Sequence, residues 1–309
     1  MPKSIYSFFL LVLFSLALTG CGARSDDTTP GMAERLLKLR GYFFTQQDFF
    51  KAIRLGDGKA VKAFLQGGMD PNVRDEDGRS AINFALENTD ASMIGPLMEK
   101  ADLLSIDGAG NTPIFLALKH NHREIFEGLL EKGADVNSLG RSGVVGKQTL
   151  LQVAVQKRDI ELVRRLLEKG ANPNQADGSG TVPLFETVNR EPASLDIMNL
   201  LIEKGADVNW VSSTTGSTAL INAAANFRMR SETKLQIVTT LLEKGADPNK
   251  QEILSGYTAM MHIALDYQMP TEIREQILKM LLDRGADKTL KTTDGKTVLD
   301  LIKEMTEEE

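Results

Sequence analysis

A nine-residue phrase that returns along the chain constrains this sequence more than any other feature. "LLEKGADVN" occupies positions 129–137, and near copies occur as "LLEKGANPN" at 166–174, "LIEKGADVN" at 201–209 and "LLEKGADPN" at 241–249. The residues that open the repeating units are spaced by 32 to 40 positions: Ser80, Thr112, Thr149, Val182, Thr218, Thr258 and Thr297. An irregular period in this range predicts a solenoid of stacked units, with the extra residues in loops.

The unit "NTPIFLALKHNHREIFEGLLEKGADVN" illustrates the local structure that each repeat predicts. Thr112 is a good helix N-cap, and Pro113 stands at the first helical position, where its missing N–H costs nothing. Asn121 tolerates the left-handed conformation that ends this helix, and Gly133 does the same after a second helix. Asp-Gly pairs at 77–78, 177–178 and 294–295 predict tight turns between units.

One unit alone is too small to fold. It buries about six large apolar side chains at about 1.5–3 kcal/mol each, whereas ordering its backbone costs about 1–2 kcal/mol per residue. Stacking allows each helix pair to bury both flanks against its neighbours, so stability grows with each added interface. The repeated phrase therefore specifies an interface between units.

These motifs resemble the ankyrin repeat, whose consensus combines Thr-Pro-Leu-His-x-Ala, Gly-His, Leu-Leu and Gly-Ala-Asp-Val-Asn. The resemblance covers about residues 48–304 and implies an all-α ankyrin-repeat solenoid of stacked antiparallel helix pairs with hairpin fingers. We expect an N-terminal helical cap at 32–46, then about seven repeats plus a terminal half-repeat at 47–309. The matching positions in two units are Thr112, Pro113, Ile114, Ala117, His122, Ile125, Leu129, Leu130, Gly133, Ala134, Asp135 and Asn137, and Thr149, Ala154, Leu162, Val163, Leu166, Leu167, Gly170 and Asn174.

Several units depart from this consensus. Other residues replace the consensus histidine, so the hydrogen bond that the family makes there is expected to be absent in those units: Phe115, Gln152, Phe185 and Ile221. The second unit, "LMEKADLL", lacks its glycine, and "TAMMHIAL" at 258–265 has one residue too many. The loops between helices are longer by 2 residues in "NREPASLD" and by 6 each in "FRMRSETK" and "DYQMPTEI". We expect these insertions to lengthen helices or loops without breaking the stack.

The first twenty residues differ from everything that follows. Lys3 and a 14-residue apolar stretch are typical of a secretory signal, and the stretch is shorter than the roughly 20 residues that span a bilayer. Leu-Thr-Gly then precedes the only cysteine, and this arrangement resembles a bacterial lipoprotein signal peptide. The resemblance implies a signal peptide at 1–20, diacylglycerol on Cys21, and a lipidated N-terminus with a flexible tether at 21–31. An uncleaved signal anchor with an idle cysteine is the alternative.

A lipidated Cys21 would determine where the protein works. Two or three acyl chains, palmitate among them, hold a protein stably on a membrane, whereas one holds it marginally. We therefore expect a lipid-anchored protein of the bacterial cell envelope. If enterobacterial sorting rules apply, Gly22 rather than aspartate after the cysteine favours the outer membrane over the inner, and we expect the protein to face the periplasm.

The sequence offers little catalytic or ligand-binding chemistry. Three histidines, one cysteine and the lack of a Ser-His-Asp arrangement argue against an enzyme, and the net charge of −6 argues against nucleic acid as a partner. His120 and His122 form a His-x-His pair, but His122 is the consensus loop histidine, so we expect no metal site. "GRSGVVGKQT" lacks the first glycine and the Ser or Thr of a phosphate loop, and is interpreted as an enlarged finger. We expect no cofactor.

Function must then lie on the surface, since the fold alone does not supply it. The ankyrin resemblance implies partner contacts through finger tips and the first helix of each pair. Apolar residues at the predicted finger tips are candidates for partner binding: Trp210, Val211, Ile253, Leu254 and Tyr257, with Val144 and Val145 on the enlarged finger. The alternative is that these side chains pack against neighbouring fingers. Basic residues at first-helix ends are a second set of candidates that would attract an acidic partner, or else a solvated edge: Lys119, His120, Lys157, Arg158, Arg190, Arg228 and Arg230.

Two classes of function remain. The first is a monomeric, non-catalytic scaffold or regulator that holds another envelope protein, with an inhibitor or immunity protein that masks an enzyme as a variant. The second is an envelope enzyme or a binder of small ligands. A deep pocket lined by titratable groups with perturbed pKa values would favour the second class, and an open surface the first.

Overall fold

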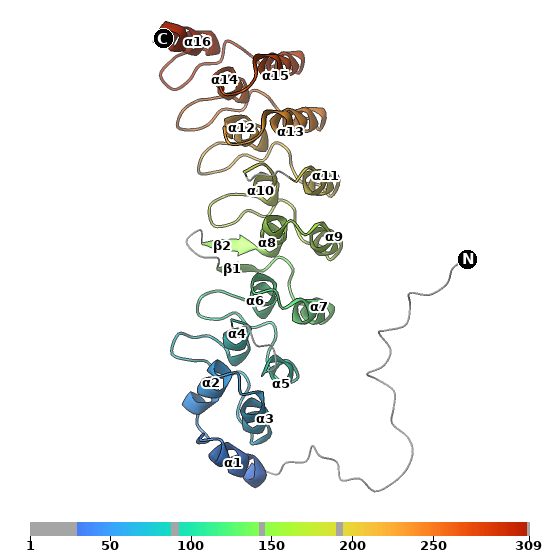
Figure 1. The fold of residues 1–309 in the computed structure, drawn as a ribbon, viewed down its shortest axis with the longest axis vertical. Coiled ribbons are helices and arrows are strands. Elements are labelled where there is room, and N and C mark those ends of the chain that lie inside the picture. The colour runs from blue at the N-terminus through green and yellow to red at the C-terminus, as the bar shows by residue number, and fades with distance from the viewer. Residues whose placement is uncertain (1–29, 88–92, 142–145, 190–193, 308–309) are drawn as a thin grey trace, which may run out of the picture.

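The computed structural model describes residues 30–87, 93–141, 146–189 and 194–307 of the 309-residue chain. The signal segment, Cys21 and most of the predicted tether, together with Val144, Val145 and Arg190, lie outside these described residues. The described part forms an elongated stack of helices in two rows, with α1 at one end and α16 at the other (Figure 1). The predicted solenoid of stacked antiparallel helix pairs is confirmed.

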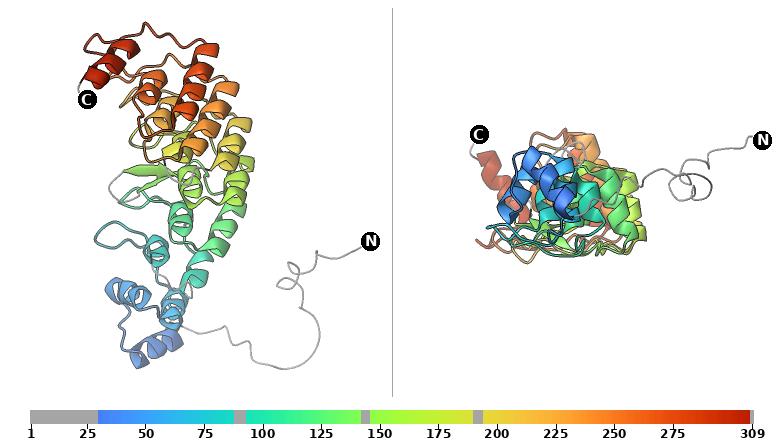
Figure 2. Two further views of the ribbon diagram at one scale, coloured as in Figure 1. Left: turned by 45° about the horizontal axis from the view of Figure 1, so that its top comes forward. Right: turned by 90° about the horizontal axis from the view of Figure 1, so that it is seen from below.

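One row consists of the first helix of each pair, which we call the inner row. Its members are α2 (Gln46–Arg54), α4 (Ala81–Leu86), α6 (Pro113–Lys119), α8 (Leu150–Lys157), α10 (Pro183–Asn189), α12 (Ala219–Ala225), α14 (Ala259–Ala264) and α16 (Val298–Glu307). The outer row is α3 (Gly58–Gln66), α5 (Ile94–Met98), α7 (Arg123–Glu131), α9 (Ile160–Glu168), α11 (Leu195–Glu203), α13 (Ser231–Glu243) and α15 (Thr271–Asp283). Within each row the helices follow one another along the stack, and the loops between units project beyond the inner row (Figures 1 and 2).

The inner helices begin where the predicted cap residues stand. Side-chain oxygens of five of these residues accept a hydrogen bond from the backbone N–H three positions later: Ser80, Thr112, Thr149, Thr218 and Thr258. Thr297 accepts the same bond from Asp300 before α16. Val182, which opens α10, has no side-chain oxygen with which to make it. The threonine of the repeated unit therefore acts locally, by satisfying a free N–H at the start of each helix.

The helix ends also follow the sequence. Asn121 has a φ of 63° and Gly133 a φ of +83°, as the left-handed C-terminal conformations require. The tight turn predicted at 177–178 forms over residues 177–180, where the Gly180 N–H donates to the Asp177 carbonyl at 3.1 Å and Gly180, with a φ of +78°, takes the left-handed position. A Cβ on Gly178 would instead lie 3.3 Å from the backbone nitrogen of Lys147 in the preceding finger. Gly178 thus permits two fingers to approach closely.

The core runs between the two rows. Its fully buried side chains are mainly Ala, Leu, Ile, Val and Phe from both helices of every pair, as repeat-to-repeat burial requires. The predicted enlarged finger forms a two-stranded antiparallel hairpin, β1 (Leu139–Arg141) and β2 (Lys147–Thr149), in which Gly140 pairs with Gln148. A Cβ on Gly140 would collide with the Phe115 ring at 2.0 Å, so this strand lies directly on α6.

The two six-residue insertions are accommodated in the C-terminal half of the stack. The outer helices α13 and α15 have 13 residues each, whereas α7, α9 and α11 have nine. Lys234 in α13 is fully buried, and its Nζ lies 2.6 Å from the Asp266 carboxylate in the next unit, which is 5% exposed. The same Nζ donates to the Ala224 carbonyl at 3.2 Å and lies 5.4 Å from the centre of the Phe227 ring. A buried ion pair therefore joins the two lengthened units.

The described part of the chain begins with α1 (Pro30–Leu39), which starts inside the segment predicted as tether. Ala33 and Leu37 of this helix are buried, and α1 packs on α3. The Arg40 guanidinium pairs with the Asp57 carboxylate at 2.8 Å and ties the end of α1 to the loop between α2 and α3. Helix α1 thus covers one end of the stack. Within the described residues, none of the helices has both the length and the hydropathy needed to cross a membrane.

Candidate functional site

The fingers are joined by a ladder of asparagines that the sequence comparison between units did not reveal. The Asn174 side chain donates from Nδ2 to the Gly205 carbonyl at 2.8 Å and accepts from the Asp207 backbone N–H at 2.7 Å. The last residue of the repeated phrase therefore contacts the same phrase in the next unit. Asn137, Asn209 and Asn249 make the same pair of bonds to the units that follow them.

The ladder is incomplete where the glycine is deleted from the second unit. Asn72 still accepts from the Asp102 backbone N–H at 2.7 Å, but Leu104 stands where the other units have asparagine. The Ser105 hydroxyl donates to the Asp102 carbonyl within its own turn, at 3.1 Å. Helix α5 in this unit has only five residues. Because leucine has no amide side chain, the second unit makes neither ladder bond to the third.

Trp210 is not the exposed finger-tip side chain that the sequence predicted. It is half-buried, it packs against the C-terminal hydrophobic cluster, and its Nε1 is buried without a hydrogen-bond partner in the described residues. The assumption that packing has no use for an indole there is wrong, because the indole packs against a hydrophobic cluster that several units contribute. Whether Trp210 also contacts a partner stays a prediction.

Tyr257 is likewise half-buried against the same cluster. Its ring centre lies 5.2 Å from that of His262, and His262 Nε2 lies 3.5 Å from a Glu252 carboxylate oxygen. Burial lowers the pKa of His262 and Lys234 lowers it further, against the opposing effect of Glu252. The expectation that Tyr257 projects freely from its finger is therefore corrected in the same way as for Trp210.

Ile253 and Leu254 match the prediction for exposed apolar finger tips. Their side chains are 58% and 81% exposed, and Val211, on the preceding finger, is 42% exposed. We call Ile253 and Leu254 the tip pair. Its backbone is bonded on both sides: the Ile253 N–H donates to the Thr215 carbonyl at 2.9 Å, and the Thr293 hydroxyl donates to the Leu254 carbonyl at 3.1 Å. The tip pair is therefore an apolar projection on a backbone that two neighbouring fingers hold in place.

A close approach makes this position rigid. Gly216 has a φ of +73°, and a Cβ there would lie 2.6 Å from the Ile253 backbone nitrogen. Adjacent fingers thus touch through backbone at this point, which only glycine allows. A rigid apolar projection loses little entropy when it binds, which is the property of a binding hot spot.

The predicted basic rim is partly engaged with the protein itself. Lys119 donates to the Arg141 carbonyl at 3.2 Å, and the Lys157 ammonium donates to the Asn121 side chain. Burial lowers the pKa of His120, and the charges of Lys119, His122 and Lys157 lower it further. Positive charge therefore gathers at the ends of α6 and α8, although each lysine also fastens a neighbouring loop.

The histidine pair has a structural use. His122 Nε2 lies 3.1 Å from the Leu86 carbonyl and links α7 to the preceding unit. The described residues contain no group of three or more His, Cys, Asp or Glu side chains arranged to hold a metal ion. Gln152, which replaces the consensus histidine in its unit, donates to the Thr181 carbonyl at 2.8 Å. An inter-unit hydrogen bond is therefore kept there by a different side chain.

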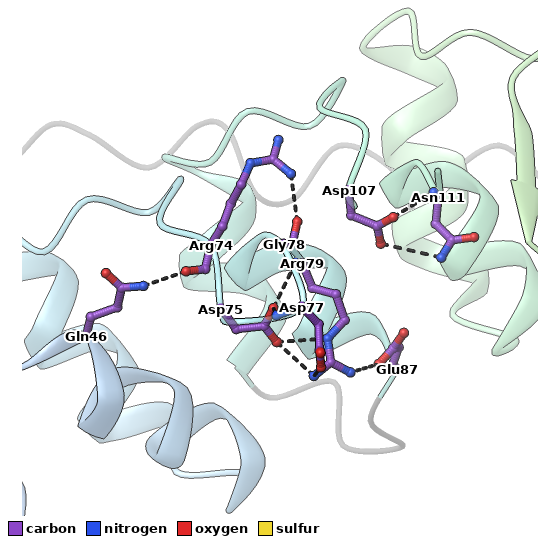
Figure 3. A network of polar contacts seen from close by, with 9 residues as sticks. All are labelled: Gln46, Arg74, Asp75, Asp77, Gly78, Arg79, Glu87, Asp107 and Asn111. Atoms are coloured by element: carbon purple, nitrogen blue, oxygen red, sulfur yellow. Dashed lines mark hydrogen bonds and ion pairs between the residues drawn. The ribbon is translucent and has the colours of Figure 1, made fainter. Parts of the chain in front are cut away.

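The first finger carries a polar network that sequence analysis missed (Figure 3). The Arg79 guanidinium contacts the carboxylates of Asp75 at 2.8 Å, Asp77 at 3.0 Å and Glu87 at 3.1 Å. It also lies over the Phe84 ring, 4.7 Å from its centre. The acidic run "RDEDGR" at 74–79 was the available signal. An open groove between this finger and α2 is lined by charged side chains of both signs.

The comparisons with known proteins agree with this geometry. The solved ankyrin repeat domain of Bcl-3, a member of the IkappaB protein family, superposes with a TM-score of 0.55 at 24% identity, covering 75% of this chain and all of that one. An ankyrin repeat protein of Acanthamoeba polyphaga mimivirus is 25% identical over 169 residues, or 52% of this chain. Zygote-specific protein 3 of Chlamydomonas reinhardtii is 28% identical over 93 residues, or 30% of this chain. The matches span only 21% and 25% of these two relatives.

The family model for ankyrin repeats matches three overlapping or adjacent parts of the sequence, residues 49–139, 150–252 and 184–292. Together these parts cover most of the described stack. Proteins built from ankyrin repeats are typically non-catalytic modules that mediate interactions between proteins. With its capped helix pairs, asparagine ladder and projecting fingers, the chain belongs to the ankyrin repeat family.

Proposed function

We propose that this protein is a membrane-anchored scaffold or regulator of the bacterial cell envelope that holds another protein against its fingers. The observation that carries the proposal is the tip pair: Ile253 and Leu254 are exposed, apolar and held by backbone bonds to both neighbouring fingers. Exposed apolar side chains on a rigid platform favour protein binding. The ankyrin repeats supply the general capacity to bind a protein.

The anchor in this proposal is lipid on Cys21, at the end of the predicted lipoprotein signal. The chain then reaches α1 after only eight residues, so the N-terminal end of the repeat stack stays close to the membrane. We further propose that the protein is monomeric and faces the periplasm from the outer membrane. Its partner would be a second envelope protein within reach of the fingers.

Partner capture by the tip pair tests the interaction. An affinity-tagged full chain carrying Leu254→Ser should capture its envelope partner at least tenfold less well than the parent, because 1.4 kcal/mol corresponds to one decade in affinity. Leu282→Ser is the matched control, since Leu282 is 49% exposed on outer helix α15, away from the fingers. Equal loss of capture in both variants, or in neither, would contradict the assignment of the tip pair.

Metabolic labelling tests the anchor separately. A clickable palmitate analogue should label the parent chain and not Cys21→Ser, which should accumulate as unprocessed precursor. Equal labelling of parent and variant would end the lipoprotein interpretation while leaving the finger-binding proposal intact.

A further inference from the structure

The N-terminal cap exposes an apolar stripe that the repeat stack does not use. Met32, Leu36 and Leu39 lie at positions i, i+4 and i+7 of α1 and are 58%, 37% and 88% exposed. Residues at this spacing share one helix face. The buried Ala33 and Leu37 lie on a neighbouring face that packs against the stack. Helix α1 therefore has two apolar faces, of which one is covered.

Further exposed apolar residues follow α1 at the same end of the molecule. Phe43 is 71% exposed in the loop after α1, and Leu55, 65% exposed, lines an open depression together with Arg40 and Lys59. Figures 1 and 2 show α1, α2 and α3 together at the end of the stack, opposite α16. We call this end, residues 30–66, the cap.

The cap is basic in an otherwise acidic protein. Residues 30–66 contain seven Lys and Arg against three Asp and Glu, a formal charge of +4. Residues 67–309 contain 27 Lys and Arg against 37 Asp and Glu, a formal charge of −10. Arg35 and Lys38 lie on α1 itself, at exposed positions close to the apolar stripe in sequence. An apolar helix face beside basic side chains is typical of a helix that lies in the interface of an anionic membrane.

The position of the cap in the chain also indicates that the membrane covers the stripe. Eight residues separate Cys21 from Pro30, and eight extended residues span at most about 28 Å. If Cys21 carries lipid, the cap is thus the part of the stack nearest the membrane. We propose that the cap docks on the membrane surface, with the stripe of Met32, Leu36 and Leu39 in the interface and the basic side chains at anionic headgroups. This inference rests on the proposed lipid anchor.

Docking through the cap would orient the whole molecule. Because α1 covers one end of an elongated stack, a cap seated on the bilayer directs the remaining units away from it (Figure 1). The acidic remainder is repelled by an anionic surface, whereas the cap is attracted. The tip pair, which lies near the far end of the stack, would then face proteins at a distance from the membrane.

A fluorescent probe on the full-length lipoprotein tests this docking. The chain has one cysteine, so after lipidation of Cys21 an introduced thiol is the only one that reacts. Leu39→Cys places an environment-sensitive nitrobenzoxadiazole probe in the stripe, and Leu299→Cys is the control, because Leu299 is 55% exposed on α16 at the opposite end. Each labelled protein is reconstituted into vesicles of phosphatidylglycerol and phosphatidylethanolamine that contain a doxyl-labelled lipid as quencher.

We expect the probe at 39 to shift its emission to the blue and to be quenched by the doxyl lipid, and the probe at 299 to do neither. Arg35→Gln with Lys38→Gln should lower the ratio of docked to undocked cap about 25-fold, at about fivefold per charge. The control pair Lys288→Gln with Lys291→Gln, exposed at the other end, should leave this ratio unchanged.

Three other results would overturn the proposal in distinguishable ways. If the protein floats with the vesicles while the probe at 39 remains aqueous, the anchor holds and the docking is refuted. If the probe at 39 is shielded from water but not quenched by the doxyl lipid, another part of the chain or a second copy covers the stripe. If the parent chain does not float and its Cys21 takes the thiol label, the lipid anchor itself fails, and the docking inference fails with it.

Discussion

Replacing Asn174 by alanine should weaken the stack at one defined interface. The substitution removes both ladder bonds, from Asn174 Nδ2 to the Gly205 carbonyl at 2.8 Å and from the Asp207 N–H to Asn174 Oδ1 at 2.7 Å. The control is Asn172→Ala, two positions earlier in the same turn. The Asn172 side chain accepts only from the Asn174 N–H, at 2.9 Å, and makes no bond to the next unit in the described structure.

The expected magnitude follows from the number of bonds and their exposure. A hydrogen bond contributes about 0.5–1.5 kcal/mol net, and these groups are exposed, so water can replace part of what is lost. Asn174→Ala should therefore lower the free energy of unfolding by about 1–2 kcal/mol, and Asn172→Ala by about 0.5 kcal/mol. At about 2–4 °C per kcal/mol for a chain of this size, the difference is measurable in a thermal melt.

Native-state hydrogen exchange locates the effect. The Asp207 amide loses its acceptor in Asn174→Ala, so its exchange should accelerate about tenfold per 1.4 kcal/mol, while amides in the first units stay protected. If Asn172→Ala were as damaging as Asn174→Ala, or if the Asp207 amide exchanged at the parent rate, the ladder would not be what joins neighbouring fingers.

Three further predictions follow from the repeat geometry and from two buried groups. Gly170→Val and Gly285→Val both force a β-branched residue to a φ near +90°, in open space, at a cost of about 1–3 kcal/mol. Denaturant melts should show a loss of stability across the whole stack for Gly170→Val and fraying of the last unit alone for Gly285→Val. Equal global loss in both variants would contradict nearest-neighbour coupling. Asp266→Ala leaves the fully buried Lys234 ammonium without its carboxylate and should lower the free energy of unfolding, measured by urea denaturation, by about 3–5 kcal/mol. The double variant Lys234→Met with Asp266→Leu should be nearly neutral. Similar losses in both would show that packing, rather than the unpaired charge, causes the effect. Burial lowers the pKa of His262 below its usual 6.5, so the unfolded chain binds the proton first as the pH falls. The melting temperature of the parent should therefore drop as the pH falls below about 6.5, and that of His262→Gln should drop less. Parallel pH profiles of the two proteins would contradict this.

The repeated features of the fold were predictable because they are local. A cap such as Thr112, a left-handed residue such as Asn121 and a helix-ending glycine such as Gly133 act within one turn of their own position, so the sequence alone reveals them. The stacking follows from their repetition at a nearly constant period.

What could not be predicted depends on contacts between units. The side chain of Trp210 follows a finger-starting asparagine in sequence, but the surface that half-buries it belongs to a cluster that reaches from Val182 to Leu301. The pairing of Lys234 with Asp266 joins positions 32 apart, and neither insertion alone indicates it. The exposure of Ile253 and Leu254 was predictable because both residues lie in the turn between Glu252 and Ser255 at a finger tip, where the neighbouring fingers bond to the backbone and leave the side chains exposed.

Site-specific photo-crosslinking at Leu254 in living cells tests the proposed function most directly. A photoreactive phenylalanine analogue at position 254 lies at the exposed finger tip, and the same analogue at Leu282 on α15 is the control. The proposed function predicts one dominant adduct with an envelope protein at 254 and none at 282. Identical adducts at both positions, or no protein adduct at 254, would contradict a partner held against the fingers.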